Sequence, residues 1–345
     1  MGEYARSLAV ADGAAARWPG AAIQFMLSRA APYAALAPHP ATLLDSSPTF
    51  HSAAVIGLIE TWRPDVVIFD NAGRTAQLRA ARRCGARVVY ISARPRQRRK
   101  AFRLRWMRLI DEHWIAYPEF LAGALGVLER LKLALLQRPT VRYLDVMLTA
   151  ARGAVQESML ARLGFAVRTY VLVVPGGGTG HPGARGAMLE FVAVARGLAA
   201  RGVDTILVGQ APAADDHAAD ADSSPHLRLL ATLPQSELAE LMRGARLVIA
   251  NGGSTLLQAI ACGKPCIAVP IAGDQHERVR RCEAAGAAIG AALDAAAIGA
   301  AASALLQDPA ALAALQGRAV ALGLADGVQV ALRALDALLA RSGPV

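Results

Sequence analysis

The segment between residues 245 and 288 constrains the fold most, because two apolar runs in it each end in a polar loop that contains glycine. The runs Arg246–Ala250 and Cys266–Pro270 have the length and composition of buried strands. Helical apolar spacing covers Leu256–Cys262, and Gly263-Lys264-Pro265 ends that helix. This order predicts a parallel sheet with both loops at the carboxyl ends of their strands, where ligands bind in such sheets.

Two glycine-rich loops are candidate anion sites. Asn251-Gly252-Gly253-Ser254-Thr255 lets the backbone approach a ligand closely, and a helix N-terminus follows it. A second apolar strand, Tyr170–Val174, runs into the loop Pro175–Gly183 and then into the helix Ala187–Arg201. The spacing of the glycines fits neither the Walker A loop nor the G-x-G-x-x-G fingerprint.

These residues resemble the donor-binding half of GT-B glycosyltransferases, most closely the bacterial family 28 type. That type includes the N-acetylglucosaminyltransferase that makes the lipid-linked peptidoglycan precursor. The resemblance is carried by Gly252, Thr255, Gly263-Lys264-Pro265 and Asp274-Gln275. One position departs from the family pattern, because Gln258 replaces the acidic residue that holds the nucleotide ribose. An amide can still hydrogen-bond a ribose hydroxyl.

The resemblance implies which residues bind the donor. Backbone groups of the two glycine-rich loops would meet the diphosphate, Gln258 the ribose, and Asp274 and Gln275 the sugar hydroxyls. The loop before the helix that starts near residue 236 would wrap the base. The expected donor-binding residues are Gly176, Gly177, Gly178, Thr179, Gly180, Leu233, Gly252, Gly253, Ser254, Thr255, Gln258, Asp274 and Gln275.

The chain length of 345 residues favours two domains. Apolar strands alternate with helical segments in the first half as well, which predicts a parallel sheet there. The expected strands of this half are Ala21–Ser28, Val66–Phe69, Val88–Ser92 and Trp114–Tyr117. The predicted fold is α/β with GT-B architecture, two Rossmann-like doubly wound domains. We expect an acceptor domain over 1–160, a nucleotide-sugar domain over 161–327, and a last helix over 328–345 that returns to the first domain.

Three residues are candidates for catalysis. The first residues resemble a family pattern in which a strand and a loop that ends in His precede the first helix. Glu3 stands at the His position, so we expect the first strand of the domain to be absent from this chain. Glu3 could serve as general base toward the acceptor, or it could only stabilise the helix N-terminus. Asp70 follows a strand and could orient the acceptor or the base, or could be a simple loop residue. His181 could transfer a proton, or could have a structural role.

Positive charge is concentrated in the first half of the chain. Residues 1–150 hold 21 Lys/Arg against 11 Asp/Glu, whereas residues 151–345 hold 16 of each, so the excess of +10 lies in the first half. The basic segment Ser92–Ile110 interleaves arginines with aromatic and aliphatic residues. It predicts an acceptor or membrane patch, with a solvated basic surface and nucleic-acid binding as alternatives. The patch residues are Arg98, Arg99, Lys100, Arg103 and Trp106.

The resulting prediction is an inverting glycosyltransferase that moves a sugar from a nucleotide-sugar, with UDP as the expected nucleotide, to a hydroxyl acceptor. The acceptor is expected to be a small molecule, lipid-linked or anionic, with no nucleic-acid partner. No Asp-x-Asp motif is present, so we expect neither a metal nor a cofactor besides the nucleotide-sugar. No signal peptide is visible, and the expected location is cytoplasmic, at the inner face of the membrane. The alternatives are a nucleotide-sugar hydrolase of the same fold and a GT-B protein that binds without catalysis.

Overall fold

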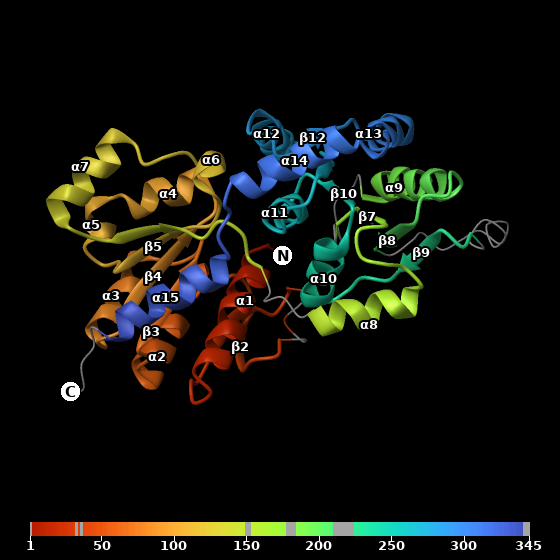
Figure 1. Ribbon diagram of the computed structural model, residues 1–345. Helices are drawn as coiled ribbons and strands as arrows, with labels where there is room; N and C mark the ends of the chain where they lie inside the picture. The colour runs from red at the N-terminus through yellow and green to blue at the C-terminus, as the bar shows by residue number, and fades with distance from the viewer. Residues whose placement is uncertain are drawn as a thin grey trace. The chain divides into compact units, whose positions relative to one another are not determined.

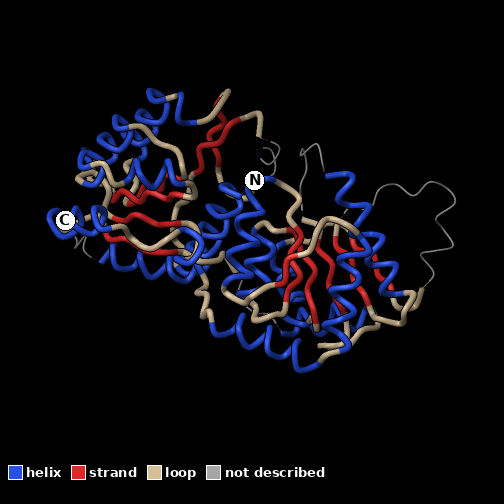
Figure 2. The backbone as a smooth tube through the Cα atoms, turned by 90° about the horizontal axis from the view of Figure 1, so that it is seen from above, coloured by secondary structure: helices blue, strands red, loops and turns tan. Residues whose placement is uncertain are grey.

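The computed structural model describes residues 2–31, 34, 37–148, 153–176, 184–209 and 224–340. The chain divides into two compact units. Unit 1 comprises Met1–Met147 and Ala325–Val345, and unit 2 comprises Leu148–Leu324. Figures 1 and 2 show that each unit is built of strands that lie between helices.

Unit 1 contains two parallel sheets. Its helices are α1 (Gly2–Arg17), η2 (Pro48–Phe50), α2 (Ser52–Trp62), α3 (Thr75–Arg83), α4 (Pro95–Ala101), α5 (Leu104–Met107), α6 (Glu119–Ala122), α7 (Val127–Leu136) and α15 (Gly327–Ala340). Its strands are β1 (Phe25–Ser28), β2 (Ala41–Leu44), β3 (Val66–Asp70), β4 (Arg87–Ser92), β5 (Glu112–Ile115) and β6 (Thr140–Tyr143). The strand orders are β1-β2 and β3-β4-β5-β6. Within the described residues, α1 precedes every strand of the unit.

Helices cover both faces of the four-stranded sheet because its central strand β4 is apolar on both sides. Val88 and Tyr90 belong to a core with residues of α2, α3, α4 and α5. Val89 and Ile91 belong to a second core with residues of α1 and α15. Such continuous apolar runs are typical of parallel strands that are buried on both faces.

Unit 2 is a doubly wound domain with one parallel sheet of six strands. Its helices are α8 (Gly153–Leu163), α9 (Ala184–Ala199), α10 (Gln235–Gly244), α11 (Ser254–Ala261), α12 (Gly273–Ala284), α13 (Ala295–Gln307) and α14 (Pro309–Ala321). Its strands are β7 (Val171–Val174), β8 (Thr205–Val208), β9 (Leu227–Leu230), β10 (Leu247–Asn251), β11 (Cys266–Val269) and β12 (Ile289–Gly290). The order is β12-β11-β10-β7-β8-β9. Helices α9 and α13 lie on one face of the sheet, and α8 and α10 on the other (Figure 1).

The topological switch point of unit 2, at which the order of the strands reverses, lies between β7 and β10. On one side of β7 the chain proceeds through β8 and β9, and on the other through β10, β11 and β12. Leu247 and Ala250 of β10 pair in register with Val171 and Val174 of β7. The loops that follow these two strands therefore leave the sheet side by side, which is where doubly wound sheets bind ligands.

The domain boundary differs from the one predicted at residue 160. That position lies inside α8, which packs on α10 of unit 2, where Gln156 Nε2 donates a hydrogen bond of 2.7 Å to the carbonyl oxygen of Glu240. The boundary lies between Met147 and Leu148. The last helix, α15, belongs to unit 1.

No single helix of the described residues is long and apolar enough to cross a bilayer. The adjacent helices α13 and α14 reach the required length and composition only together, and they are bent by 100° relative to one another.

Candidate functional site

The carboxyl edge of β7, β10 and β11 in unit 2 brings Gly176, which follows β7, close to the loop of Gly252 and Gly253, which follows β10. Gly176 has a φ of +90°, and a Cβ added there would lie 2.0 Å from Nδ2 of Asn251. Only glycine combines that backbone conformation with so close an approach. The Asn251 Oδ1 accepts a hydrogen bond of 3.1 Å from the Gly253 amide. Asn251 is 8% exposed, and its side chain lies between Gly176 and the Gly253 amide.

Helix α11 begins directly at this edge. Its N-cap is Gly253, which has no side chain to bond the first amides of the helix. Ser254 and Thr255 form the first turn, and Gln258 lies one turn further on, 7% exposed. The free amide groups and the positive end of the helix dipole favour an anion at such a terminus.

A cation from α12 lies beside the same loop. Arg278 Nη1 donates a hydrogen bond of 2.7 Å to the carbonyl oxygen of Gly252, and its Nη2 lies 3.4 Å from Oδ2 of Asp274. Gly252 is packed against α12, since an added Cβ would lie 2.7 Å from Cγ2 of Val279. The Gln275 Oε1 accepts a hydrogen bond of 2.9 Å from the Ile271 amide and so shapes the loop after β11. A guanidinium and a helix N-terminus together suit a phosphate group.

The other predicted donor residues differ in exposure, and several of them lie outside the described part of the chain. Asp274 is largely exposed in the first turn of α12. Leu233 is half-buried between β9 and α10. Gly177, Gly178, Thr179, Gly180 and His181 lie outside the described residues.

In unit 1, Glu3 and Asp70 lie near one another although 67 positions separate them in the sequence. Asp70 ends β3, and its carboxylate accepts bonds from Nε and Nη2 of Arg6, at 3.0 and 2.5 Å, and from the Ser7 hydroxyl at 3.1 Å. Burial raises the pKa of Asp70, while the positive charge of Arg6 acts in the opposite direction. The oxygens of Asp70 are thus already engaged, and this residue positions α1 on the sheet.

Glu3 is exposed and is oriented by Asn71. The Asn71 Nδ2 donates a hydrogen bond of 2.8 Å to Oε1 of Glu3, and its Oδ1 accepts one of 2.8 Å from the Ala93 amide. Asn71 has a φ of 53°, a left-handed conformation that Asn tolerates better than most residues. This places one oriented carboxylate at the carboxyl edge of β3 and β4.

The sequence matches the protein family described as UDP-N-acetylglucosamine 2-epimerase over residues 145–329. The chain belongs to this family. The matched residues span unit 2, which holds the Gly176, Gly252 and Gly253 loops. A search of curated proteins finds no match.

Solved structures similar to this epimerase-family chain have the GT-B fold, which confirms the predicted fold class. The spinosyn forosaminyltransferase SpnP has a TM-score of 0.61 at 15% identity, with coverage of 96% of this chain and 95% of that one. A Phytolacca americana enzyme in complex with UDP-2fluoro-glucose and pterostilbene has a TM-score of 0.66 at 13% identity, with coverage of 98% and 97%. A putative UDP-N-acetylglucosamine 2-epimerase from Listeria monocytogenes has a TM-score of 0.54 at 14% identity, with coverage of 92% and 96%.

Three residues of the predicted basic patch have structural roles in this epimerase-family chain. Trp106 is 1% exposed, and its indole nitrogen donates to the Thr75 hydroxyl at 3.1 Å. Lys100 donates to the carbonyl oxygen of Gly73 and stacks on Trp106. Arg98 forms an ion pair with Glu129 on α7. The side chains of these three residues are therefore not available for the acceptor or membrane patch that the sequence predicted. The other two patch residues, Arg99 and Arg103, are exposed.

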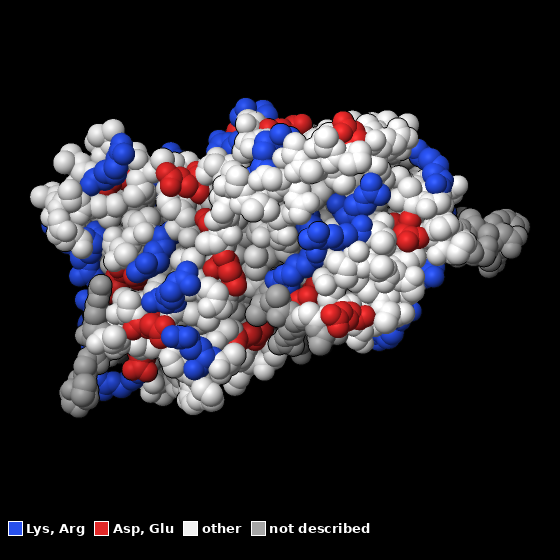
Figure 3. All heavy atoms as spheres, viewed as in Figure 1, with Lys and Arg blue, Asp and Glu red and all other residues white. Residues whose placement is uncertain are grey.

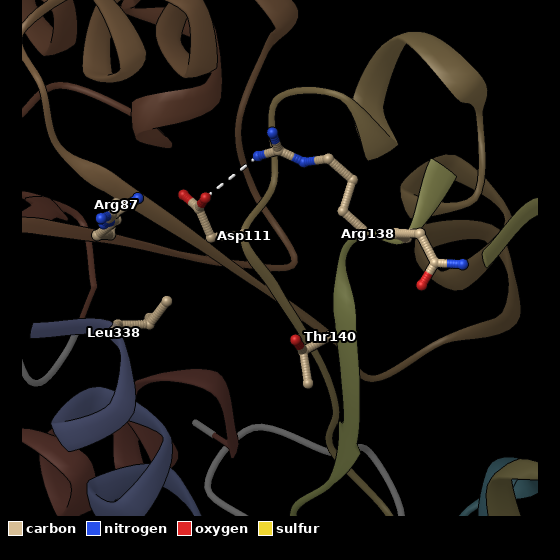
Figure 4. Close-up of a pocket in the computed structure, with 6 residues that line it drawn as sticks. Arg87, Asp111, Arg138, Thr140 and Leu338 are labelled. Carbon is tan, nitrogen blue, oxygen red and sulfur yellow. Dashed lines mark hydrogen bonds and ion pairs between the residues drawn. The ribbon is translucent and has the colours of Figure 1, made fainter. Parts of the chain in front are cut away.

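A pocket in unit 1 lies at the opposite edge of the sheet from Glu3. It is lined by residues at the amino ends of β4, β5 and β6, and Figure 4 shows Arg138 extended toward Asp111. Asp111 also pairs with Arg82 at 2.8 Å and accepts a hydrogen bond from the Val88 amide. Asp111 thus connects these elements, and none of the residues that line the pocket is one of the predicted site residues.

The sequence analysis missed three residues: Asn251, whose side chain lies against Gly176, and Arg278 and Asn71. Arg278 stands four positions after Asp274 on a helix, a spacing at which charged side chains meet, so its pairing could have been found. The contacts of Asn251 with Gly176 and of Asn71 with Glu3 join distant parts of the sequence, and no local pattern indicates them.

Proposed function

We propose that this protein is an inverting glycosyltransferase that moves a sugar from a UDP-sugar to a hydroxyl acceptor. The observation that carries the proposal is the convergence of Gly176, the Gly252–Gly253 loop, the N-terminus of α11 and Arg278 at the switch point of unit 2. The name of the family refers to a UDP-sugar, and a similar GT-B structure holds a UDP-sugar analogue.

Unit 2 would stabilise the leaving group. As the acceptor oxygen bonds to the anomeric carbon, the bond from that carbon to the diphosphate oxygen breaks and the electron pair leaves with UDP. The developing charge would be met by the α11 amides and by Arg278, in interactions that strengthen as the charge grows. We propose that this arrangement needs no metal ion and no cofactor besides the donor. A single displacement of this kind inverts the anomeric centre.

Unit 1 would bind the acceptor. Glu3 would take the proton of the attacking hydroxyl, with Asn71 holding its carboxylate in place. The exposed arginines Arg99 and Arg103 favour an anionic or lipid-linked acceptor. We accordingly propose a cytoplasmic location at the inner face of the membrane. We also propose that this glycosyltransferase is of the family 28 type.

A second candidate is epimerisation of the UDP-sugar at carbon 2, which the family match favours. Epimerisation must remove and return a proton at that carbon, so it calls for acid and base groups around the sugar. Glu3 is oriented and exposed, whereas Asp70 is engaged by Arg6. Transfer needs a single base toward the acceptor, and the oriented and exposed Glu3 can supply it, which supports transfer as the first candidate.

Calorimetry with UDP, UDP-glucose and UDP-N-acetylglucosamine tests the proposed donor site. Arg278→Ala should weaken binding of UDP or its sugar about tenfold or more, because it removes a cation that would contact the diphosphate. Arg280→Ala is the matched control, since Arg280 lies on the same helix, exposed and paired with Glu277. Absence of binding by every donor, or equal loss in both variants, contradicts the donor site.

Product analysis by mass spectrometry then separates the candidates. Transfer requires an acceptor and gives a glycoside. Epimerisation gives a C2 epimer, and hydrolysis consumes the donor in water alone. Glu3→Gln should lower turnover about 100-fold with little change in donor affinity if Glu3 is the base.

A further inference from the structure

The cavity at the amino ends of β4, β5 and β6 joins parts of unit 1 that are distant in the sequence. Its volume of about 220 Å³ is room for several water molecules or for one small ligand. The strand ends, the turn before β6 and the helix α15 provide its lining, which consists of Arg87, Asp111, Gln137, Arg138, Thr140 and Leu338. Because Glu3 lies at the opposite edge of the sheet, this cavity is separate from the proposed reaction site.

Positive charge exceeds negative charge at this cavity. The Asp111 carboxylate accepts hydrogen bonds of 2.9 and 2.8 Å from Nη1 of Arg82, one of 3.1 Å from Arg138, and one of 2.8 Å from the Val88 amide. Figure 4 shows Arg87 and Arg138 on opposite sides of Asp111. Three arginines thus accompany one carboxylate whose oxygens are already engaged, so the cavity favours an anion over a cation. Over the face of unit 1 seen in Figure 3, by contrast, Lys and Arg are interspersed with Asp and Glu.

One donor group of Arg138 lacks an acceptor. Its Nη2 contacts Asp111 and, at 3.3 Å, the carbonyl oxygen of Ile110. Its Nε is buried and has no hydrogen-bond partner among the described residues. A buried N–H group without a partner is unfavourable, and in native proteins such a group can mark the place of a bound water or ion. Because Arg138 lines the cavity, an oxygen of an anion held there can serve as the acceptor.

We propose that this cavity binds a small phosphate dianion, free or as a phosphate monoester, between Arg87 and Arg138. A guanidinium forms paired hydrogen bonds with phosphate oxygens, and a dianion would balance the excess of arginines. The Thr140 hydroxyl would supply a further donor, and Leu338 would pack against the carbon atoms of a monoester. Since Leu338 belongs to α15 and Thr140 to β6, a bound phosphate would connect the last helix of unit 1 to its sheet. The inference stands independently of the proposed transfer reaction.

Hydrogen exchange of the full chain tests the proposal with three additions: inorganic phosphate, glycerol 3-phosphate, and sodium chloride at equal ionic strength. We expect both phosphates to slow exchange in residues 136–143 and 332–340, because a ligand that binds only the folded state protects the elements that it joins. Chloride should leave this exchange unchanged. Equal affinity for the two phosphates would mean that the phosphate group alone is recognised. Tighter binding of glycerol 3-phosphate would mean that a monoester also contacts the apolar side of the cavity.

A matched pair of variants separates charge from shape. Thr140 is exposed, and Thr140→Glu and Thr140→Gln introduce side chains of nearly the same size. Glu adds a negative charge beside the cavity, so it should raise the dissociation constant for phosphate about tenfold or more relative to Gln. Circular dichroism verifies that both variants are folded. If Thr140→Glu does not fold, Arg87→Gln replaces it and should weaken phosphate binding for the same reason.

Phosphate can also occupy the proposed donor site of unit 2, so the measurement is repeated with Arg278→Ala. Protection of residues 136–143 should persist in that variant. The proposal is wrong if phosphate leaves these residues unprotected, if chloride protects them equally, or if the two Thr140 variants bind phosphate equally well. Calorimetry with UDP reads the unit 2 site by itself, so failure of the donor site and failure of the phosphate site are distinguishable.

Discussion

His113 shows how burial sets the chemistry of a single side chain in unit 1. It is fully buried in β5, its Nε2 lies 2.8 Å from the Ser92 hydroxyl, and its Nδ1 has no partner among the described residues. Phe102 packs edge-on against its ring, and Tyr90 lies beside it. Burial, with a smaller effect from the charge of Arg98, lowers the pKa of His113 to about 3. The imidazole is therefore neutral in the folded protein.

The free energy of unfolding should fall as the pH falls below about 6.5, the ordinary pKa of His. Between that pH and the lowered pKa of His113, the unfolded chain binds a proton at this site and the folded chain does not, so acid favours unfolding. From pH 7.5 to about pH 4.5 the loss from this residue should be about 2 to 3 kcal/mol.

Urea unfolding of the wild type and of His113→Gln at both pH values measures this contribution. The variant should show a smaller loss between the two pH values, whatever its stability at pH 7.5. His226→Gln is the control, because His226 is partly exposed beside Asp204. An equal loss in the wild type and in His113→Gln would refute the role of His113.

At the scale of helices and strands, Arg98 holds the α6–α7 segment. Its side chain is 12% exposed, and its guanidinium contacts Glu129 together with three carbonyl oxygens. Removing it leaves these groups without their charged partner, a loss of about 2 to 3 kcal/mol. Arg98→Ala should therefore speed amide hydrogen exchange in residues 119–136 and leave unit 2 unchanged.

Arg99→Ala is the matched control for this measurement, because Arg99 is the exposed neighbour on the same helix. Exchange in residues 119–136 should match the wild type in that variant. Equal exchange in all three proteins would mean that α7 is held by contacts other than those of Arg98.

Buried elements were predicted from the sequence more successfully than exposed ones. The strands β7, β10 and β11 lie where apolar runs placed them, since both of their faces are buried and the runs are almost entirely apolar. The short strands β2 and β6 were missed, since each is only half-buried and gives no continuous apolar run.

Side-chain environment was harder to predict than element type. Trp106 was taken as a surface residue because arginines flank it, but one helical turn places it in the core between Tyr90 and Lys100. The leucines of α7 resemble a buried helical stripe in the sequence, yet they are exposed. Periodicity identifies which residues share a face, and it does not tell what that face contacts.

For the whole molecule, the discontinuous course of the chain makes unit 1 dependent on its last helix. α15 supplies Ala331, Ala334, Leu335 and Leu338 to the core that contains Val89, Ile91 and Trp114. Its fit against α1 is close, since a Cβ added at Gly13 would lie 2.7 Å from Cγ1 of Val328. Unit 2, in contrast, is one continuous segment with its own core.

A polar residue in α15 should therefore destabilise unit 1 and spare unit 2. Leu335 is 5% exposed, and Leu335→Asn removes apolar burial and introduces an unpaired amide, which together should lower the stability of unit 1 by about 3 to 5 kcal/mol. Hydrogen exchange should then rise across β4 and β5 but not across β10 and β11, and UDP binding should persist. Arg333→Asn, at an exposed position of the same helix, should change neither unit. Exchange that rises equally in both sheets would instead mean that the two units unfold as one cooperative body.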